Sequence, residues 1–266
     1  MKCANEIWRD IFVLNELTFE TLDEHIPVTI VKNVLKYPDK VREFMDNGYW
    51  WGNDYNQSYT RPGKSFEFGQ NIDVYFDLLA EDLMEFYDAE DIIPIEIYGN
   101  CFNGNMDLYN VRSALPHVDT FPGDHQNENP LNDFAFNLNL TKSDKVKTSF
   151  YSFNNKISIC DFHKTDYEDL RNCWDRQKDI RKDKTWFLVD DECDNYRLEY
   201  IADIEYNSMI LYPSHYWHNC YLKEEWFTDT DRITFTGFFE TIFSDDRIGP
   251  TYDPELKRYV KKLGFD

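Results

Sequence analysis

The sequence predicts a mainly β fold with flanking helices, in which two helical elements precede a jelly roll. From residue 92 onward, short runs of β-branched and aromatic residues alternate with Asn, Asp, Gly and Pro, as in β sandwiches and barrels. Helical periodicity is strongest before that point. With 21 Phe, 18 Tyr and 7 Trp in 266 residues, the chain has enough apolar surface for a folded core.

The first third of the chain should form a strand and two helices. Residues 26–31 alternate as a short strand, and Pro38 then begins a helix that ends near Gly48. Apolar residues recur at helical spacing between residues 71 and 87, with acidic residues on the other side. We expect both helices to pack against a sheet.

Seven further runs predict strands, and no repeat or linker divides them. They span residues 95–98, 108–111, 134–140, 148–153, 186–189, 208–212 and 233–239. We expect one domain over 1–266, with support elements in 1–91, a core over about 92–243 and a tail in 244–266. The polar insertion at residues 165–184 has a helical apolar stripe, and it should cover an edge or opening of the sheets.

Charge and cysteine content exclude several classes of function. The chain has 28 Lys and Arg against 50 Asp and Glu, a net charge of −22. This charge repels nucleic acid and anionic membranes, so a neutral or cationic partner is expected. No apolar leader and no apolar stretch of membrane-spanning length occurs, so a cytoplasmic protein is expected. The six cysteines include no C-x-x-C pair, which favours reduced, structural thiols.

Three short segments, taken together, indicate a metal-binding and carboxylate-binding site. His117 and Asp119 form a His-x-Asp segment, His218 ends the segment Tyr-Pro-Ser-His-Tyr-Trp-His, and Arg232 and Thr234 begin a predicted strand. In an extended segment, residues i and i+2 point to the same face, so His117 and Asp119 can reach one ion. Two imidazoles and one carboxylate form the facial triad of non-haem Fe(II) oxygenases. Arg232 can bind a carboxylate through two parallel hydrogen bonds, and Thr234 can add a hydroxyl group.

With these motifs, the chain resembles the Fe(II)/2-oxoglutarate-dependent dioxygenases, whose core is a double-stranded β-helix. It is most similar to the prolyl-hydroxylase-like branch, and within it to a little-characterised bacterial and phage group. The similar segments are Pro-His-x-Asp at 116–119, Thr-Ser-Phe-Tyr at 148–151, Tyr-Pro-Ser at 212–214 with His218, and Arg-Ile-Thr at 232–234. Val146 and Lys147 stand in place of a glycine pair, and Ser214 replaces a glycine. The resemblance covers residues from about 26 to 239.

The resemblance implies a set of ligands and an activity. His117, Asp119 and His218 would bind Fe(II), and Arg232 and Thr234 would bind 2-oxoglutarate. O2 would oxidise 2-oxoglutarate to succinate and CO2 while the substrate is hydroxylated. The substrate would be an amino-acid side chain, such as that of a prolyl residue, in a protein or peptide. The net negative charge of the chain is consistent with a cationic substrate. A free small molecule as substrate and a non-catalytic metal-binding module of the same fold remain alternatives.

Several residues have a second interpretation. His215 competes with His218 as the distal ligand, although the resemblance favours His218, and His125 is most simply a loop residue. Arg232 could instead be a surface partner of Asp229 and Asp231. Tyr109 is a candidate to donate its hydroxyl to 2-oxoglutarate, but a core position is the more common one for a tyrosine.

Two further expectations concern polar side chains and loops. Asn137 and Asn139 alternate with apolar residues, so one polar face of their strand could line the cavity or meet solvent. The segments 165–184 and 47–68 should border the opening above the metal, because loops on a rigid β scaffold often carry specificity.

Overall fold

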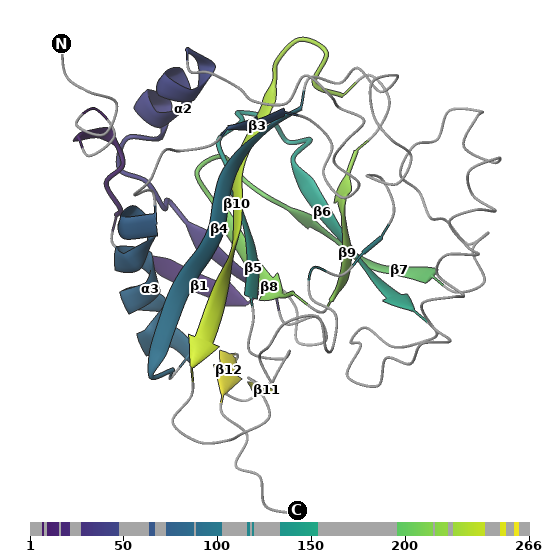
Figure 1. The fold of residues 1–266 in the computed structure, drawn as a ribbon. Coiled ribbons are helices and arrows are strands. Elements are labelled where there is room, and N and C mark those ends of the chain that lie inside the picture. The colour runs from purple at the N-terminus through teal and green to yellow at the C-terminus, as the bar shows by residue number, and fades with distance from the viewer. Residues whose placement is uncertain are drawn as a thin grey trace, which may run out of the picture.

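Two antiparallel sheets form the body of the protein (Figure 1). The structure, a computed structural model, describes residues 7, 10–15, 17–21, 28–47, 64–66, 73–87, 89–102, 116–117, 119, 134–153, 196–214, 216–222, 226–242, 251–253 and 258–260. The larger sheet has the order β1 (Thr18–Thr21), β2 (Thr29–Lys32), β8 (Met209–Pro213), β5 (Phe134–Asn139), β10 (Arg232–Ile242), β4 (Asp91–Phe102) and β3 (Lys64–Phe66). The smaller sheet has the order β7 (Tyr196–Asp203), β6 (Lys147–Phe153) and β9 (Trp217–Tyr221). A separate ribbon pairs β11 (Thr251–Asp253) with β12 (Arg258–Val260).

The strand pairing is that of a jelly roll, or double-stranded β-helix. Along the chain, β4 pairs with β10, His117 bridges to His218 in β9, β5 pairs with β8, and β6 pairs with β7. Each successive segment of the first half therefore pairs with a progressively earlier partner from the second half, as in a long hairpin rolled into two facing sheets. This pairing confirms the predicted fold class.

Helices cover one face of the larger sheet. Figure 1 shows α3 (Asp73–Tyr87) lying along β4, on the side away from the smaller sheet, and α3 contacts β4. Pro38 occupies the first turn of α2 (Pro38–Asp46), where its missing N–H is no loss. Val41 and Met45 of α2 and Phe76 of α3 share an apolar cluster with the outward-facing residues of β5 and β10. Both predicted helices are thus confirmed, and no helix among the described residues is long and apolar enough to span a membrane.

The two sheets face each other across a second apolar cluster. Its members include Phe102, Phe150, Ile210 and Tyr212, which alternate with outward-facing residues along their strands. Side chains from β4, β5, β8 and β10 therefore meet those from β6, β7 and β9 inside the barrel. This interior is where a ligand-binding site of this fold can form.

A close approach and a tight turn fix the sheet locally. At the irregularity in the pairing of β10 with β4, a Cβ on Gly237 would lie 2.9 Å from both Cγ1 of Ile97 and Cε1 of Phe136, so a larger residue would fit only if these neighbours shifted. Asn207 has a φ of 61°, a conformation that asparagine adopts more readily than most residues. Its side chain accepts a hydrogen bond from the backbone N–H of Leu35 (2.9 Å) and donates to the Leu35 carbonyl (2.8 Å). This pair of bonds ties the N-terminal segment to the turn before β8.

The predicted strands fall on observed ones where the structure describes them. Residues 134–140, 148–153, 208–212 and 233–239 match β5, β6, β8 and β10, whereas 95–98 is only the middle of the longer β4. The sequence analysis did not predict β7 or recognise β9 as a strand. The expected strands at 108–111 and 186–189 lie outside the described residues.

Candidate metal and co-substrate site

Backbone hydrogen bonds bring the His-x-Asp segment to β9. The backbone N–H of His117 donates to the carbonyl of His218, and the N–H of His218 donates back to His117, both at 2.9 Å. Asp119 is held by its own N–H, which donates to the carbonyl of Ser214 at 2.9 Å. Within the smaller sheet, His218 of β9 pairs with Phe150 of the neighbouring strand β6. The three polar side chains are therefore positioned by main-chain pairing, with His117 at a single bridge and Asp119 at a bend rather than in a regular strand.

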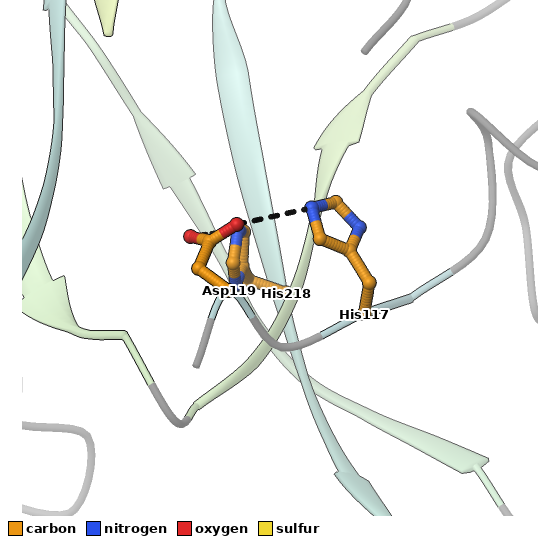
Figure 2. Close-up of side chains that lie close together, drawn as sticks. All are labelled: His117, Asp119 and His218. Carbon is orange, nitrogen blue, oxygen red and sulfur yellow. Dashed lines mark ion pairs between the residues drawn. The ribbon is translucent and has the colours of Figure 1, made fainter. Parts of the chain in front are cut away.

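The side chains of His117, Asp119 and His218 turn toward one another (Figure 2). Nε2 of His117 lies 3.6 Å from Oδ1 of Asp119, and Nε2 of His218 lies 3.2 Å from Oδ2. One ligand atom from each residue falls within 4.8 Å of the other two. Two nitrogens and one oxygen at this spacing are suited to one divalent ion, and the sequence placed all three residues in such a triad.

Contacts around His218 fix the orientation of its ring. Its Nδ1–H donates to the carbonyl oxygen of Tyr216 at 2.8 Å, which leaves the lone pair of Nε2 for a metal. The ring centroid of Tyr212 lies 4.6 Å from that of His218, and the His117 centroid lies 4.5 Å away. His218 is buried, so these contacts act without competition from bulk water.

The neighbouring carboxylate changes the acidity of His218. Burial alone would lower its pKa, because desolvation disfavours the imidazolium. The charge of Asp119, its hydrogen bond to the ring and the carbonyl of Tyr216 outweigh burial, and they raise the pKa above the ordinary 6.5. Protons therefore compete with a divalent cation for Nε2 of His218 more strongly than they would at a free imidazole.

An enclosed cation lies on the inner face of β10. Arg232 is only 3% exposed, and its Nε and Nη2 atoms have no hydrogen-bond partner among the described residues. Thr234, two residues on and on the same face, is fully buried, and its Oγ1 likewise lacks a partner in the described part of the chain. A buried guanidinium without an anion is strongly unfavourable, so this position is suited to an anionic ligand.

The alternative interpretation of Arg232 is wrong. It required an exposed arginine paired with Asp229 or Asp231, but the side chain is buried inside the barrel. Within the described residues it forms no ion pair with either carboxylate, both of which are exposed. The strand direction explains this, because Arg232 begins β10 with its side chain on the inner face, opposite Phe102 of β4.

Cys220 is a neighbour of this cation that the sequence analysis did not single out. It lies two residues after His218 in β9, so the two side chains share the inner face, and it packs against the interior cluster. Burial raises the pKa of the thiol, and the positive charge of Arg232 partly opposes this rise. Its spacing from His218 was the signal that could have placed it in the cavity.

Some candidates lie outside the described residues. They are His215, His125, Tyr109, the insertion 165–184 and most of the segment 47–68, so the structure does not test their expected roles. Tyr212, which begins the Tyr-Pro-Ser segment, packs directly on a candidate metal ligand. The Tyr216 carbonyl carries no side-chain signal, so the sequence could not have indicated its role.

Comparison with known proteins finds similarity only at the level of solved structures. No protein-family profile and no curated protein matches the chain. A structure of HygX from Streptomyces hygroscopicus with nickel, 2-oxoglutarate and hygromycin B bound is 11% identical, covers 88% of this chain and 92% of its own, and has a TM-score of 0.46.

Two further neighbours are more distant. The non-haem alpha-ketoglutarate-dependent epimerase SnoN from nogalamycin biosynthesis is 9% identical over 80% of this chain and 76% of its own, with a TM-score of 0.41. An N-substituted L-amino acid dioxygenase from Burkholderia ambifaria AMMD is 10% identical over 81% of this chain and 85% of its own, with a TM-score of 0.38. At these values the function must be argued from the residues of this chain itself.

Proposed function

We propose that the chain is an Fe(II)- and 2-oxoglutarate-dependent dioxygenase that hydroxylates an amino-acid side chain. One observation carries the proposal: a triad of two imidazoles and a carboxylate lies in the same barrel as a buried guanidinium, two of whose nitrogen atoms have no hydrogen-bond partner among the described residues. The triad is suited to a divalent ion with open coordination positions, and the guanidinium is suited to a carboxylate. A metal-chelating dicarboxylate satisfies both requirements.

The metal would be held by Nε2 of His117, Nε2 of His218 and one carboxylate oxygen of Asp119. The hydrogen bond from Nδ1–H of His218 to the Tyr216 carbonyl fixes the tautomer in which Nε2 carries a lone pair, so this ligand is correctly oriented before the ion binds. Mixed nitrogen and oxygen ligands also accept Mn, Co, Ni or Zn. We infer Fe(II) from the chemistry of 2-oxo acids rather than from metal preference.

The co-substrate would be held at its far end by Arg232 and Thr234. A guanidinium presents two parallel N–H groups that match the two oxygens of a carboxylate, and the Thr234 hydroxyl can add a third bond. Both side chains are enclosed, which strengthens each bond because water does not compete. Tyr109 remains a candidate third donor to this carboxylate.

Bound Fe(II) would supply the coupling of O2 reduction and 2-oxoglutarate decarboxylation to the insertion of one oxygen atom into a C–H bond. The protein's own residues bind, orient and enclose the reactants. Phe150 and Tyr212 line the barrel next to His218, with ring centroids 5.1 Å apart, and they shield the site from bulk water. Such exclusion limits side reactions.

The substrate class rests on the sequence. The prolyl-hydroxylase-like resemblance supports a side chain in a protein or peptide, and the net charge of −22 supports a cationic or neutral substrate. We also propose a cytoplasmic setting, where the six cysteines would stay reduced.

Mass spectrometry of host-cell lysate tests the proposal. Lysate proteins and small molecules would be incubated with the protein, Fe(II), 2-oxoglutarate and O2, and then searched for gains of one oxygen atom. We expect modified residues in proteins with the native chain and none with Asp119→Ala. Oxygen gained only by free small molecules would favour the small-molecule alternative, and no oxygen gained anywhere would favour a non-catalytic module.

A further inference from the structure

Two asparagines of β5 point into the barrel, but within the described residues only Asn139 forms side-chain hydrogen bonds. Asn139 is fully buried and its amide is fully used. Its Nδ2 donates to the carbonyls of Thr141 (3.1 Å) and Ile204 (2.8 Å), and its Oδ1 accepts from the N–H of Thr141 (2.7 Å). Asn139 therefore has a structural role, holding the turns that follow β5 and β7.

Asn137 has the opposite character. Its Oδ1 is enclosed, and the side chain forms no hydrogen bond within the described part of the chain. The side chain is only half-buried, but an enclosed amide oxygen without a partner destabilises a fold, so packing alone does not explain an asparagine at this position. Its inward direction follows from the register, because Ala135 on the same face and Ile210 directly opposite both belong to the interior cluster. Asn137 is therefore available to a ligand in the barrel.

The register places Asn137 between the two halves of the site. It pairs with Thr236 of β10 and with Ile210 of β8. Thr234 and Tyr212 are the diagonal neighbours of Asn137 on those strands, with Cβ atoms about 7–8 Å away in such a sheet. Thr234 leads to the carboxylate anchor, and Tyr212 packs on His218. In the larger sheet, Asn137 therefore lies between a residue next to the proposed carboxylate anchor and a residue that packs on a metal ligand.

We propose that Asn137 binds the metal-proximal end of the co-substrate, donating from Nδ2 to an oxygen of its 2-oxo acid group. This inference rests on the proposed function. A 2-oxo dicarboxylate carries only hydrogen-bond acceptors, and the amide NH2 is the one group of Asn137 that can satisfy them. Because no described residue forms a hydrogen bond with this amide, it can turn its NH2 toward that acceptor. Asn137 would then orient the chelating group, while Arg232 and Thr234 hold the distal carboxylate.

Titration with two different ligands distinguishes binding at the metal-proximal end of the co-substrate from binding at its distal carboxylate. The first is 2-oxoglutarate, and the second is 2-oxopentanoate, in which a methyl group replaces the distal carboxylate. Each would be titrated into the full chain loaded with Mn(II), in wild type, Asn137→Leu and Arg232→Lys. Leu has nearly the shape of Asn but no polar atoms. Asn137→Ala serves as a second variant, in case Leu does not fit.

Asn137→Leu should weaken both ligands by about tenfold, since one hydrogen bond to a charged group is lost in each complex. Arg232→Lys should weaken 2-oxoglutarate and leave 2-oxopentanoate unchanged. Equal affinity of wild type and both Asn137 variants for the two ligands would overturn the inference. Weakening of 2-oxoglutarate alone would also overturn it, because the amide would then contact the distal carboxylate.

Thermal melting of the ligand-free variants separates a ligand-binding role from a structural one. Asn139→Leu is the matched control on the same strand and face, and it should melt well below wild type. Asn137→Leu should melt at or above the wild-type temperature, because it removes an enclosed amide oxygen that bonds to no described residue. Melting of both Asn137 variants as low as Asn139→Leu would contradict the inference. Failure of the Mn(II)-loaded wild type to bind 2-oxoglutarate would instead refute the proposed function itself.

Discussion

Replacing Arg232 by lysine tests the co-substrate half of the site. The guanidinium is buried with Nε and Nη2 unpaired among the described residues, so it can offer a carboxylate two parallel hydrogen bonds. Lysine keeps the charge but cannot reproduce this geometry. Losing one hydrogen bond to a charged group removes about 1.5–3 kcal/mol, which raises the 2-oxoglutarate dissociation constant roughly ten- to a hundredfold. The metal affinity should not change, because Arg232 forms no hydrogen bond or ion pair with His117, Asp119 or His218 in the described structure.

Calorimetric titration of the Mn(II)-loaded protein with 2-oxoglutarate measures this effect. Arg197→Lys is a suitable control, because that side chain is 72% exposed and lies 3.5 Å from Glu199 on the surface. It should bind the co-substrate as wild type does. An unchanged dissociation constant for Arg232→Lys would refute the reasoning, since the buried guanidinium would then have no role in binding the dicarboxylate.

Three further predictions concern the metal and the sheet. Metal affinity should fall as the pH drops, and the fall should begin above pH 6.5. The raised pKa of His218 means that protons compete with the metal for Nε2 at a higher pH than they would at a free imidazole. Calorimetry over a pH series measures this effect. A divalent metal at about 100 times its dissociation constant should stabilise the protein by about 2.7 kcal/mol, and Asp119→Ala should lose that gain in thermal melting. Gly237→Ala should destabilise the fold by about 1–3 kcal/mol in urea unfolding, because its Cβ would clash with Ile97 and Phe136 at 2.9 Å.

Each of these predictions has a contradicting result. Metal affinity that is flat between pH 5 and 8 would mean that no ligand titrates in about that range, against the histidine assignment. Equal metal stabilisation of wild type and Asp119→Ala would place the ion elsewhere. Wild-type stability of Gly237→Ala would mean that β4 and β10 can move apart at the irregularity in their pairing next to Gly237.

The local motifs were readable from the sequence because each depends on few residues. His117 and Asp119 stand two apart, His218 follows a Tyr-Pro turn, and Arg232 begins an alternating strand, so their residue types and spacing indicate a triad and an anion anchor. The choice of His218 over His215 as the distal ligand came from the family resemblance. The helices were equally clear, since Pro38 marks a helix start and Phe76 lies on an apolar stripe.

The remaining features depend on tertiary pairing. β4 extends through Pro94, Gly99 and Asn100, which break strands in local sequence reasoning, because pairing with β10 and β3 stabilises the whole length. Asn137 and Asn139 look alike in sequence. Only the positions of Thr141 and Ile204, which are close in space to Asn139, show which amide is engaged.

Isotope labelling of succinate tests the central claim most directly. The protein would be incubated with Fe(II), 2-oxoglutarate and host-cell lysate under 18O2, and the succinate analysed by mass spectrometry. The account predicts succinate that carries one 18O atom, formed only with added Fe(II), and abolished in Asp119→Ala and His218→Ala. Succinate at the same unlabelled background level in wild type and both variants would contradict the claim that this site activates O2 with 2-oxoglutarate.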